Sequence, residues 1–330
     1  MNIYIESRNT DPHHNLALEQ FVFDTFKEAN IFMLWQNDNS IIIGKHQNTL
    51  EEINAVFVKE KDITIARRLS GGGAVYHDLG NLNFTFITAT DNKKGIDFSV
   101  FCKPIQEALR SLGIPVEIAG RNDMTVDGKK FSGNAQYIKD GRIMHHGTIL
   151  YDSNLEILSQ ALKPGNDKIE SKGIKSVQSR VTNIRPYMKT DMSVTDFWAA
   201  LKNYMISALS MQEFALAPEQ KTSVEELKKK VYSRWSWNYG NSPPYTLRKA
   251  GRIEGCGKIE ILFDIGREGV IKNIAFYGDF FGSMDPSGLG EILIGHYLNY
   301  KDLITVLMNV DISQYFHSLD SEAFLALILG

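Results

Sequence analysis

The residues best placed to do chemistry form a glycine-rich segment that follows two arginines. Arg67 and Arg68 precede Leu69, Ser70 and three consecutive glycines at positions 71–73. Because glycine has no Cβ atom, its backbone N–H group can approach an anion closely, and the arginines would add fixed positive charge beside it. The segment therefore predicts a binding site for a phosphate or carboxylate. The alternative is a flexible connection between strands with solvated arginines.

A second segment brings an acidic and a basic side chain together. Asp127 and Gly128 are typical of a two-residue hairpin turn, which places Asp123 and Lys130 on facing strands. The ordinary roles of these two side chains would be a turn-capping aspartate and a solvated lysine, and both stay open from the residues alone. By strand alternation, the neighbouring Lys129 should face the opposite way.

A third segment begins another strand with the pair His145 and His146 beside Gly147. Two histidines could suggest a metal site. Adjacent strand residues point to opposite faces, however, and no third ligand is evident in the sequence. We therefore expect no tightly bound transition metal. The two cysteines, Cys102 and Cys256, are far apart and match no metal or redox spacing.

Strands and helices must position these segments. Short β-branched or alternating runs predict strands at 31–35, 41–44 and 63–66, and a hairpin that joins strands 74–76 and 83–87 through the turn residues 78–81. Helical spacing and end signals predict helices at 15–27, 98–112, 153–162, 193–210 and 223–235. Asp152 or Ser153 should cap the third helix. A capping box formed by Ser223 and Glu226 should start the last one.

Composition is that of an ordinary soluble globular protein. The chain has 330 residues, of which 43% are hydrophobic and 23% charged, so it can bury a large core. No run approaches the roughly 18 apolar residues of a membrane span. The N-terminus is typical of a strand rather than of a secretion signal. We expect a cytoplasmic protein that does not bind a membrane.

Charge and composition divide the chain into two parts. The net charge is −3, but residues 251–330 contain 5 basic and 11 acidic side chains, so the remainder is mildly basic. A mildly basic body suits an anionic nucleotide and an acidic protein partner, and it is too weakly charged to suggest nucleic-acid binding. The pattern changes at residues 240–244, where Pro243 and Pro244 lie. We expect a first domain at 1–245 and a small α+β domain at 246–330.

Taken together, these segments resemble the lipoate–protein ligase family of the biotin/lipoate ligase superfamily. The similarity runs from 15–19 to 237–240, about three quarters of the chain, and includes the blocks 34–37, 43–48 and 173–183. The resemblance implies an α+β fold with a biotin/lipoate-ligase-like mixed sheet and packed helices. It also implies a small α+β C-terminal accessory domain, which reorients during the catalytic cycle.

The resemblance also implies an activity. The family activates free lipoate with ATP and Mg²⁺ to lipoyl-AMP. It then transfers the lipoyl group to a lysine of a lipoyl domain, as in 2-oxoacid dehydrogenase E2 subunits, or of the glycine-cleavage H protein. We expect a salvage enzyme for free lipoic acid with these small molecules and acceptor proteins as its partners.

Residue roles follow from the matching motifs. In the pattern Asp-Gly-x-Lys-x-Ser-Gly the family lysine bridges the acid carboxylate and the α-phosphate, which implies that Lys130 is catalytic. The resemblance implies that Arg68, rather than Arg67, binds nucleotide phosphate, and Leu69 stands where relatives often have a further arginine. The residues implied to contact ATP or the adenylate are Arg68, Gly73, Ala74, Val75, Tyr76, Asn83, Asp123 and Lys130. Asp123 is also implied to hold Mg²⁺ through the phosphates.

The acyl chain requires an apolar slot. The residues expected to contact lipoate are Trp35, Gly72, His77, Lys130, His146 and Gly147. His146 would be a hydrogen-bonding wall residue, and Trp35 could equally be simple core. In relatives a loop matching residues 165–190 closes over the adenylate, which implies a role for Lys172, Lys175 and Arg180.

Three alternatives remain open. An ATP-independent lipoyl or octanoyl amidotransferase has the same fold and passes the acyl group through a cysteine thioester, which requires an activated thiolate. A biotin ligase would show a glycine–arginine alternation that the segment 67–73 lacks. A non-catalytic lipoate-binding or regulatory module would bind lipoate without turning over ATP.

Overall fold

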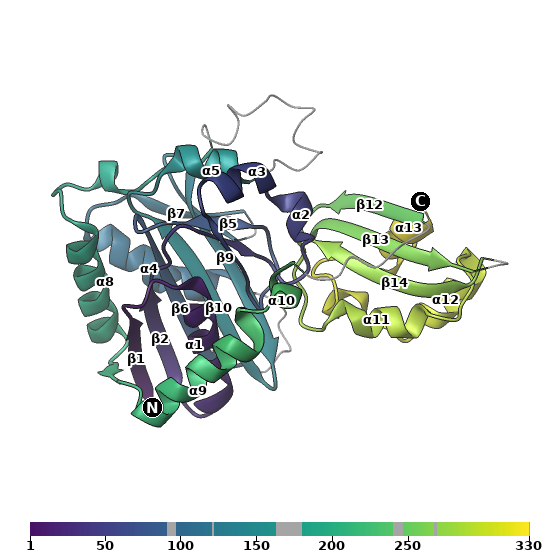
Figure 1. Cartoon of the computed structure of the whole chain (residues 1–330), viewed down its shortest axis with the longest axis horizontal. Helices are drawn as coiled ribbons and strands as arrows, with labels where there is room; N and C mark the ends of the chain where they lie inside the picture. The colour runs from purple at the N-terminus through teal and green to yellow at the C-terminus, as the bar shows by residue number, and fades with distance from the viewer. Residues whose placement is uncertain (91–96, 121, 163–179, 240–246, 267–268, 330) are drawn as a thin grey trace.

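The structure is a computed structural model that describes residues 1–90, 97–120, 122–162, 180–239, 247–266 and 269–329 (Figure 1). Lys172 and Lys175 lie outside these residues, as does the expected domain boundary after residue 245, which stays a prediction. No described helix has the length and apolar character needed to cross a membrane.

A mixed sheet of eight described strands forms the centre of the N-terminal domain. Its order is β11 (Gln212–Glu213), β1 (Asn2–Ser7), β2 (Asn30–Trp35), β6 (Asn81–Ala89), β10 (Arg142–Leu150), β9 (Lys129–Lys139), β8 (Asp123–Val126) and β7 (Val116–Ala119). The pairs β11–β1 and β1–β2 are parallel, and the others are antiparallel. The sheet confirms the expected α+β class.

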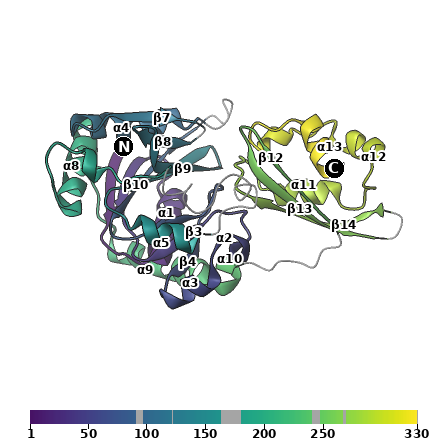
Figure 2. The ribbon, with the colours of Figure 1, turned by 90° about the horizontal axis from the view of Figure 1, so that it is seen from above.

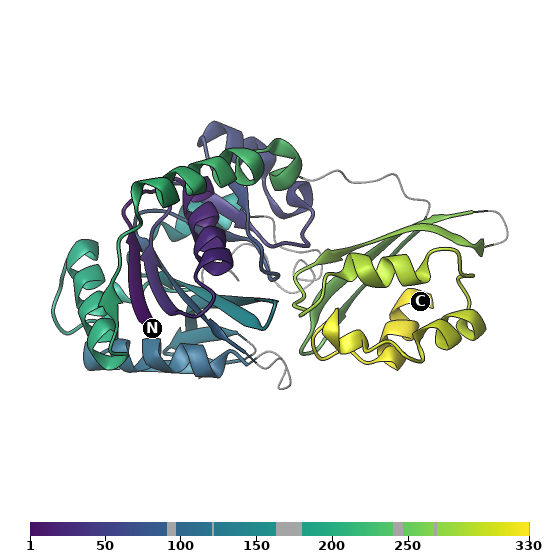
Figure 3. The ribbon, with the colours of Figure 1, turned by 90° about the horizontal axis from the view of Figure 1, so that it is seen from below.

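Helices bury both faces of this sheet. On one face, α4 (Ser99–Ser111) and α8 (Val194–Ala208) pack over an aromatic core that includes Phe32 and Phe84. On the other face, α1 (Pro12–Thr25) covers Ile31 and Met33, and α9 (Pro218–Leu227) packs against α1 (Figure 3). The strands β1, β2, β6 and β10 therefore contribute side chains to two separate cores, one on each face of the sheet.

A second, three-stranded sheet carries the glycine-rich segment. Its order is β4 (Thr64–Arg67), β3 (Ser40–Ile43) and β5 (Val75–His77), with β4 parallel and β5 antiparallel to β3. The short helices α2 (Thr49–Glu52), α3 (Ala55–Glu60) and α5 (Leu155–Ala161) lie beside it (Figure 1). Both ends of the glycine-rich segment are therefore fixed in one small sheet.

The predicted hairpin between strands 74–76 and 83–87 is wrong. Asp78 does make a turn, because its side chain accepts the backbone N–H of Gly80 at 2.9 Å. The chain nevertheless passes there from one sheet to the other: β5 pairs with β3, whereas β6 pairs with β2 and β10. The turn signal marked a real change of direction, but the partners of each strand were decided by which core buries it.

Three predicted helix starts are also wrong. Helix α1 begins at Pro12 rather than at residue 15, because the Asp11 side chain accepts the N–H of His13 and caps the helix. Asn154, not Asp152 or Ser153, caps α5. Helix α9 begins at Pro218, so Ser223 lies inside it, bonded to the Glu219 carbonyl. Asp11 and Asn154 were equally good caps close to the predicted ones, whereas α9 begins without a side-chain cap at Ala217, where Pro218 takes the first helical position.

The hairpin at Asp127 and Gly128 is confirmed. Both residues have positive φ, 49° and 71°, and they join β8 to β9. The ladder shifts between Met124 and Thr125, so that Thr125, rather than Asp123, is directly opposite Lys130.

The C-terminal domain has its own sheet and core (Figure 2). Strands β12 (Leu247–Ile253), β13 (Gly257–Ile265) and β14 (Ile271–Gly278) form an antiparallel sheet. Helices α11 (Pro286–Leu293), α12 (Tyr300–Leu307) and α13 (Ser321–Leu329) supply the rest of its core. It is the small α+β domain expected from the sequence.

Candidate functional site

Two neighbouring cavities open beside the glycine-rich segment. The inner cavity has largely apolar walls that include Leu16, Trp35 and Ile42. The outer cavity lies between β8, β9 and α5, and its wall combines apolar side chains such as Leu158 with the charged side chains of Asp123 and Arg180. The residues common to both walls are Ala74, Val75, Lys130, Gly133 and Thr148. The two cavities therefore meet at Lys130.

The structure gathers most of the predicted site residues here. All of those expected to contact lipoate line the inner cavity: Trp35, Gly72, His77, Lys130, His146 and Gly147. Those expected to contact the adenylate line one cavity or both: Arg68, Gly73, Ala74, Val75, Tyr76, Asn83, Asp123 and Lys130. Arg180 lines the outer cavity. Residues from distant parts of the chain thus meet in one place, although their roles stay predictions.

Lys130 stands at the junction with a charged partner. Its Nζ atom lies 2.6 Å from Asp123 Oδ1, and both side chains are partly exposed. The backbone of Lys130 also holds residues 180–182, because Lys130 N donates to the Arg180 carbonyl and Thr182 N donates to the Lys130 carbonyl. Lys129 is exposed, as strand alternation predicts. The ammonium group is therefore accessible from either cavity.

Arg68 is buried and bonded to the glycine-rich segment itself. Its guanidinium donates to Ser70 Oγ, to the carbonyls of Gly71 and Gly73, and to the Ile42 carbonyl, at 2.7–3.2 Å. Burial lowers the pKa of Arg68 to about 10, so it stays charged at neutral pH. In this conformation Arg68 fixes the shape of the segment.

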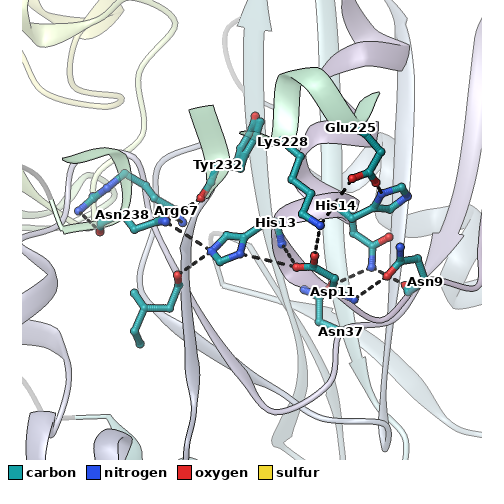
Figure 4. Close-up of polar contacts among 12 residues, drawn as sticks. Asn9, Asp11, His13, His14, Asn37, Arg67, Glu225, Lys228, Tyr232 and Asn238 are labelled. Atoms are coloured by element: carbon teal, nitrogen blue, oxygen red, sulfur yellow. Dashed lines mark hydrogen bonds and ion pairs between the residues drawn. The ribbon is translucent and has the colours of Figure 1, made fainter. Parts of the chain in front are cut away.

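Arg67 points away from the two cavities and forms hydrogen bonds to the last described helix of the N-terminal domain. It donates from Nε to the Trp237 carbonyl and from Nη2 to the Asn238 carbonyl, both in α10 (Trp235–Tyr239). Asn238 in turn accepts the Arg67 N–H and approaches His13 on α1 (Figure 4). Adjacent strand positions thus give the two arginines separate structural tasks.

Two polar groups on the inner wall lack a partner among the described residues. His77 Nδ1 lies 3.1 Å from Asn37 Nδ2, which can only donate, so the His77 proton is on Nε2. Burial, and next the charge of Arg68, lower the pKa of His77 to about 3. His77 Nε2 and Asn83 Nδ2 are both buried and unbonded. Buried donors normally find an acceptor, so these two groups predict an acceptor atom on the ligand.

A buried acid that sequence reasoning missed lies behind this wall. Glu19, on α1, is 1% exposed, and its Oε1 lies 3.1 Å from His146 Nδ1. His146 Nε2 lies 2.7 Å from Ser70 Oγ. The Thr85 hydroxyl also donates to Glu19 and accepts the Trp35 indole N–H at 2.9 Å. Two signals were available: Glu19 is a carboxylate on the apolar stripe of the predicted first helix, and it ends the block 15–19 where the family resemblance begins.

The C-terminal domain touches the glycine-rich segment, which the sequence also did not reveal. Gly72 N donates to the Phe280 carbonyl at 3.3 Å. Phe281 is 1% exposed and packs on Phe98 of the N-terminal core, with ring centroids 5.3 Å apart. The Phe280 ring stacks on His46. The two domains therefore meet at the edge of the inner cavity.

Neither cysteine is placed for nucleophilic chemistry. Cys102 is fully buried on the inner face of α4, and burial raises its pKa to about 12. Cys256 is buried in the core of the C-terminal domain. Neither belongs to the walls of the two cavities. A thiolate nucleophile is thus disfavoured at both positions.

The histidine pair is split as expected. His145 faces the aromatic core and stacks on Phe101 at 4.9 Å, whereas His146 faces the inner cavity. The described residues contain no group of three or more His, Cys, Asp or Glu side chains arranged to hold a metal ion.

Comparison with known proteins places the chain in a family. Residues 11–206 match the family model of the lipoyl protein ligase A/B catalytic domain, and residues 242–328 match the bacterial lipoate protein ligase C-terminus. Lipoate-protein ligase LplJ of Bacillus subtilis is 41% identical over 99% of both chains. Lipoate–protein ligase 1 of Staphylococcus aureus is 38% identical over 98% of this chain and 99% of its own.

Solved structures show the same fold. P. falciparum LipL1 in complex with lipoate superimposes with a TM-score of 0.80 at 23% identity, over 100% of this chain and 98% of its own. A lipoate-protein ligase A bound with ATP gives a TM-score of 0.61 at 28% identity, over 72% of this chain and 98% of its own. With both domains matched by family models and full-length relatives above 30% identity, the chain belongs to the lipoate–protein ligase family of enzymes.

Proposed function

We propose that this protein is an ATP-dependent lipoate–protein ligase that salvages free lipoic acid. The observation that carries the proposal is the meeting of the two cavities at Lys130. Attaching a carboxylic acid to a lysine amine requires a better leaving group than hydroxide. An apolar cavity for the acid, next to a second cavity with charged side chains in its wall for a nucleotide, provides the arrangement that adenylation needs.

The inner cavity would take the acyl chain. Each buried methylene is worth about 0.8 kcal/mol, so a straight medium-length chain gains roughly 3 kcal/mol in such a slot. Its carboxylate would then lie near Lys130, and the free donors of His77 and Asn83 would be available to the substrate's oxygen atoms. The outer cavity would take the nucleotide, with Arg180 and residues 74–76 along its wall.

Two displacements would follow. The lipoate carboxylate attacks the α-phosphorus of ATP, and pyrophosphate leaves to give lipoyl-AMP. The amine of the acceptor lysine then attacks the acyl carbon, and AMP leaves as the amide forms. Both reactants of the first step are anions, so Lys130 would neutralise the charge between them and hold them together.

Mg²⁺ fits this arrangement through Asp123. The ion usually binds one or two carboxylates together with substrate phosphates, and Asp123 is a partly exposed carboxylate on the outer cavity. When bound there, Mg²⁺ would neutralise phosphate charge. Asp123 would then exchange its ion pair with Lys130 for the metal, which would leave the ammonium group to the substrates.

Arg68 would contribute to phosphate binding in one of two ways. Its charge lies beside the glycine-rich segment even while its N–H groups are bonded to protein oxygens. Direct contact with a phosphate would require the guanidinium to release the Gly71 and Gly73 carbonyls.

Residues 165–190 would close over the adenylate, with Lys172, Lys175 and Arg180 facing it. Limited proteolysis in that loop should therefore be suppressed by lipoate plus ATP.

The acceptor would be a lysine on a lipoyl domain of a 2-oxoacid dehydrogenase E2 subunit or on the glycine-cleavage H protein. A neighbouring solved structure supports the first choice, because it describes a bipartite lipoate protein ligase and its E2 lipoyl domain from Thermoplasma acidophilum. That ligase aligns with a TM-score of 0.65 at 28% identity.

Lipoate-dependent exchange of labelled pyrophosphate into ATP tests the activation step directly. We expect exchange that requires both lipoate and Mg²⁺, followed by a mass increase of a purified lipoyl domain. The double variant Cys102→Ser/Cys256→Ser should keep both activities, since neither thiol lies in a cavity wall. Acyl transfer without ATP, lost in that double variant, would instead identify an amidotransferase.

A further inference from the structure

A buried carboxylate of helix α1 connects three separate parts of the inner cavity wall. Glu19 is 1% exposed, which is costly for a charged group unless donors surround it. It has two such donors in the described structure, the Thr85 hydroxyl and the His146 ring. Glu19 itself is not in the cavity wall, but His146 is. Trp35 and Arg68 also line the cavity, and they are connected to Glu19 through Thr85 and through Ser70 and His146, respectively.

The proton positions along one branch are fixed by what each atom can do. Arg68 Nε can only donate, so Ser70 Oγ accepts from it at 3.0 Å. The Glu19 carboxylate can only accept, so the neutral His146 ring carries its proton on Nδ1, which faces Glu19 at 3.1 Å. His146 Nε2 is then an acceptor, and the Ser70 hydroxyl, 2.7 Å away, donates to it. The branch runs in one direction, from Arg68 to Glu19.

The second branch ends at the same carboxylate. The Trp35 indole N–H can only donate, so Thr85 Oγ1 accepts from it at 2.9 Å. The Thr85 hydroxyl then donates to Glu19. Trp35, His146 and Arg68 all line the inner cavity, and Arg68 holds the carbonyls of the glycine-rich segment.

We propose that Glu19 is a positioning residue of the activation step, and that its charge sets the orientation of the acyl-binding wall and of the glycine-rich segment together. The inference rests on the proposed function for its kinetic consequences. Its structural basis is independent of that function: the Thr85 hydroxyl and the His146 ring both reach Glu19 Oε1, and the His146 ring also reaches Oε2 at 3.2 Å. A carboxylate accepts at all of these contacts, whereas in a neutral amide one of the two oxygens is replaced by an N–H donor.

The test replaces Glu19 with glutamine, which has nearly the same shape. In either orientation of the amide, the His146 N–H group would then meet an N–H donor at one of its two acceptor positions. Losing one hydrogen bond to a charged group corresponds to a change of about 10- to 100-fold. We expect the KM for lipoate in the exchange reaction to rise by about that factor. Glu19→Asp, which keeps the charge, should recover part of the loss.

Variants that interrupt one branch at a time show which branch is responsible for a change in KM. They also test the proposal if Glu19→Gln fails to fold. Thr85→Val interrupts only the Trp35 branch and should raise the KM for lipoate alone. Ser70→Ala interrupts only the Arg68 branch and should raise the KM for ATP as well. Gln20→Ala is the matched control on α1, because Gln20 bonds Tyr232 outside the cavity and should leave both values unchanged.

A spectroscopic measurement separates positioning from general damage. In ¹⁵N-labelled protein the His146 signal, assigned by comparison with His146→Asn, should show the Nδ1-protonated ring in the wild type and lose that preference in Glu19→Gln. Unchanged kinetics with an unchanged ring signal would overturn the proposal, as would losses equal to those of Gln20→Ala. If the wild type showed no exchange at all, the proposed function would fail while the ring signal still tested Glu19.

Discussion

Replacing Lys130 with alanine should abolish lipoate activation while leaving the fold intact. In the proposed complex the ammonium group contacts two anions, the lipoate carboxylate and the α-phosphate. Each hydrogen bond to a charged group is worth about 1.5–3 kcal/mol. Together the two contacts correspond to about 3–6 kcal/mol, or roughly a 10²- to 10⁴-fold slower exchange reaction. In the free protein the only charged partner recorded for Lys130 in the described residues is Asp123.

That ion pair gives a separate expectation for stability. The Lys130 and Asp123 side chains are 41% and 34% exposed, and exposed pairs contribute about 0–1 kcal/mol. Lys130→Ala should therefore shift the thermal midpoint by only a few degrees. Lys129→Ala is the matched control, because this lysine adjoins Lys130 in the sequence but is exposed and lines neither cavity.

The assay is lipoate-dependent ATP–pyrophosphate exchange at saturating lipoate and ATP, with thermal unfolding measured on the same preparations. A loss below about threefold in Lys130→Ala would show that the amine does not neutralise the reacting anions. Equal losses in Lys129→Ala would show that general positive charge, rather than the position of Lys130, supports the reaction. A large drop in the thermal midpoint of Lys130→Ala would contradict the exposure of its ion pair.

Two further outcomes follow from the structure. Burial lowers the pKa of His77 to about 3 and the pKa of His145 well below its usual value, so the unfolded chain takes up protons below about pH 6.5 that the folded chain does not. The free energy of unfolding should therefore fall as the pH is lowered, by at most about 1.4 kcal/mol per pH unit for each histidine, and urea midpoints that are equal at pH 7 and pH 5 would contradict this. A Cβ atom on Gly71 would lie 2.3 Å from the Phe280 carbonyl, whereas one on Gly73 would have no atom within 4 Å, so Gly71→Ala should lower the thermal midpoint and Gly73→Ala should not.

Local signals in the sequence predicted where strands and turns lie better than they predicted which strands pair with one another. The hairpin at Asp127 and Gly128 was predictable because positive φ at two successive positions suits these residues and fixes both strands at once. The turn at Asp78 was just as visible, yet the strands on either side of it belong to different sheets. Nothing within a few residues of that turn distinguishes the two cases, because the choice depends on which distant strands offer a buried partner.

For the candidate site, too, one part could be predicted from the sequence and another could not. The residues of its walls were predictable because they lie in short motifs that match a known family. Their hydrogen-bond partners were not. Whether Arg68 faces a ligand or the carbonyls of its own segment depends on backbone geometry that residue types do not encode. Glu19 bonds side chains 66 and 127 positions away, a distance that no periodicity reveals.

The contacts of Gly72 would link the binding of an anion at the glycine-rich segment to the position of the C-terminal domain. The Gly72 N–H would be a natural donor to an anion, but in this structure it donates to the Phe280 carbonyl, and the Phe281 ring lies against the same glycine. An anion and the C-terminal domain cannot both use one N–H group fully. If a phosphate or acyl oxygen binds there, it must weaken this domain contact, and a mutation that weakens the contact must favour such binding by the same free energy. The three glycines are thus constrained from two sides: Arg68 fixes their carbonyls from within, and Phe280 holds an N–H group from outside.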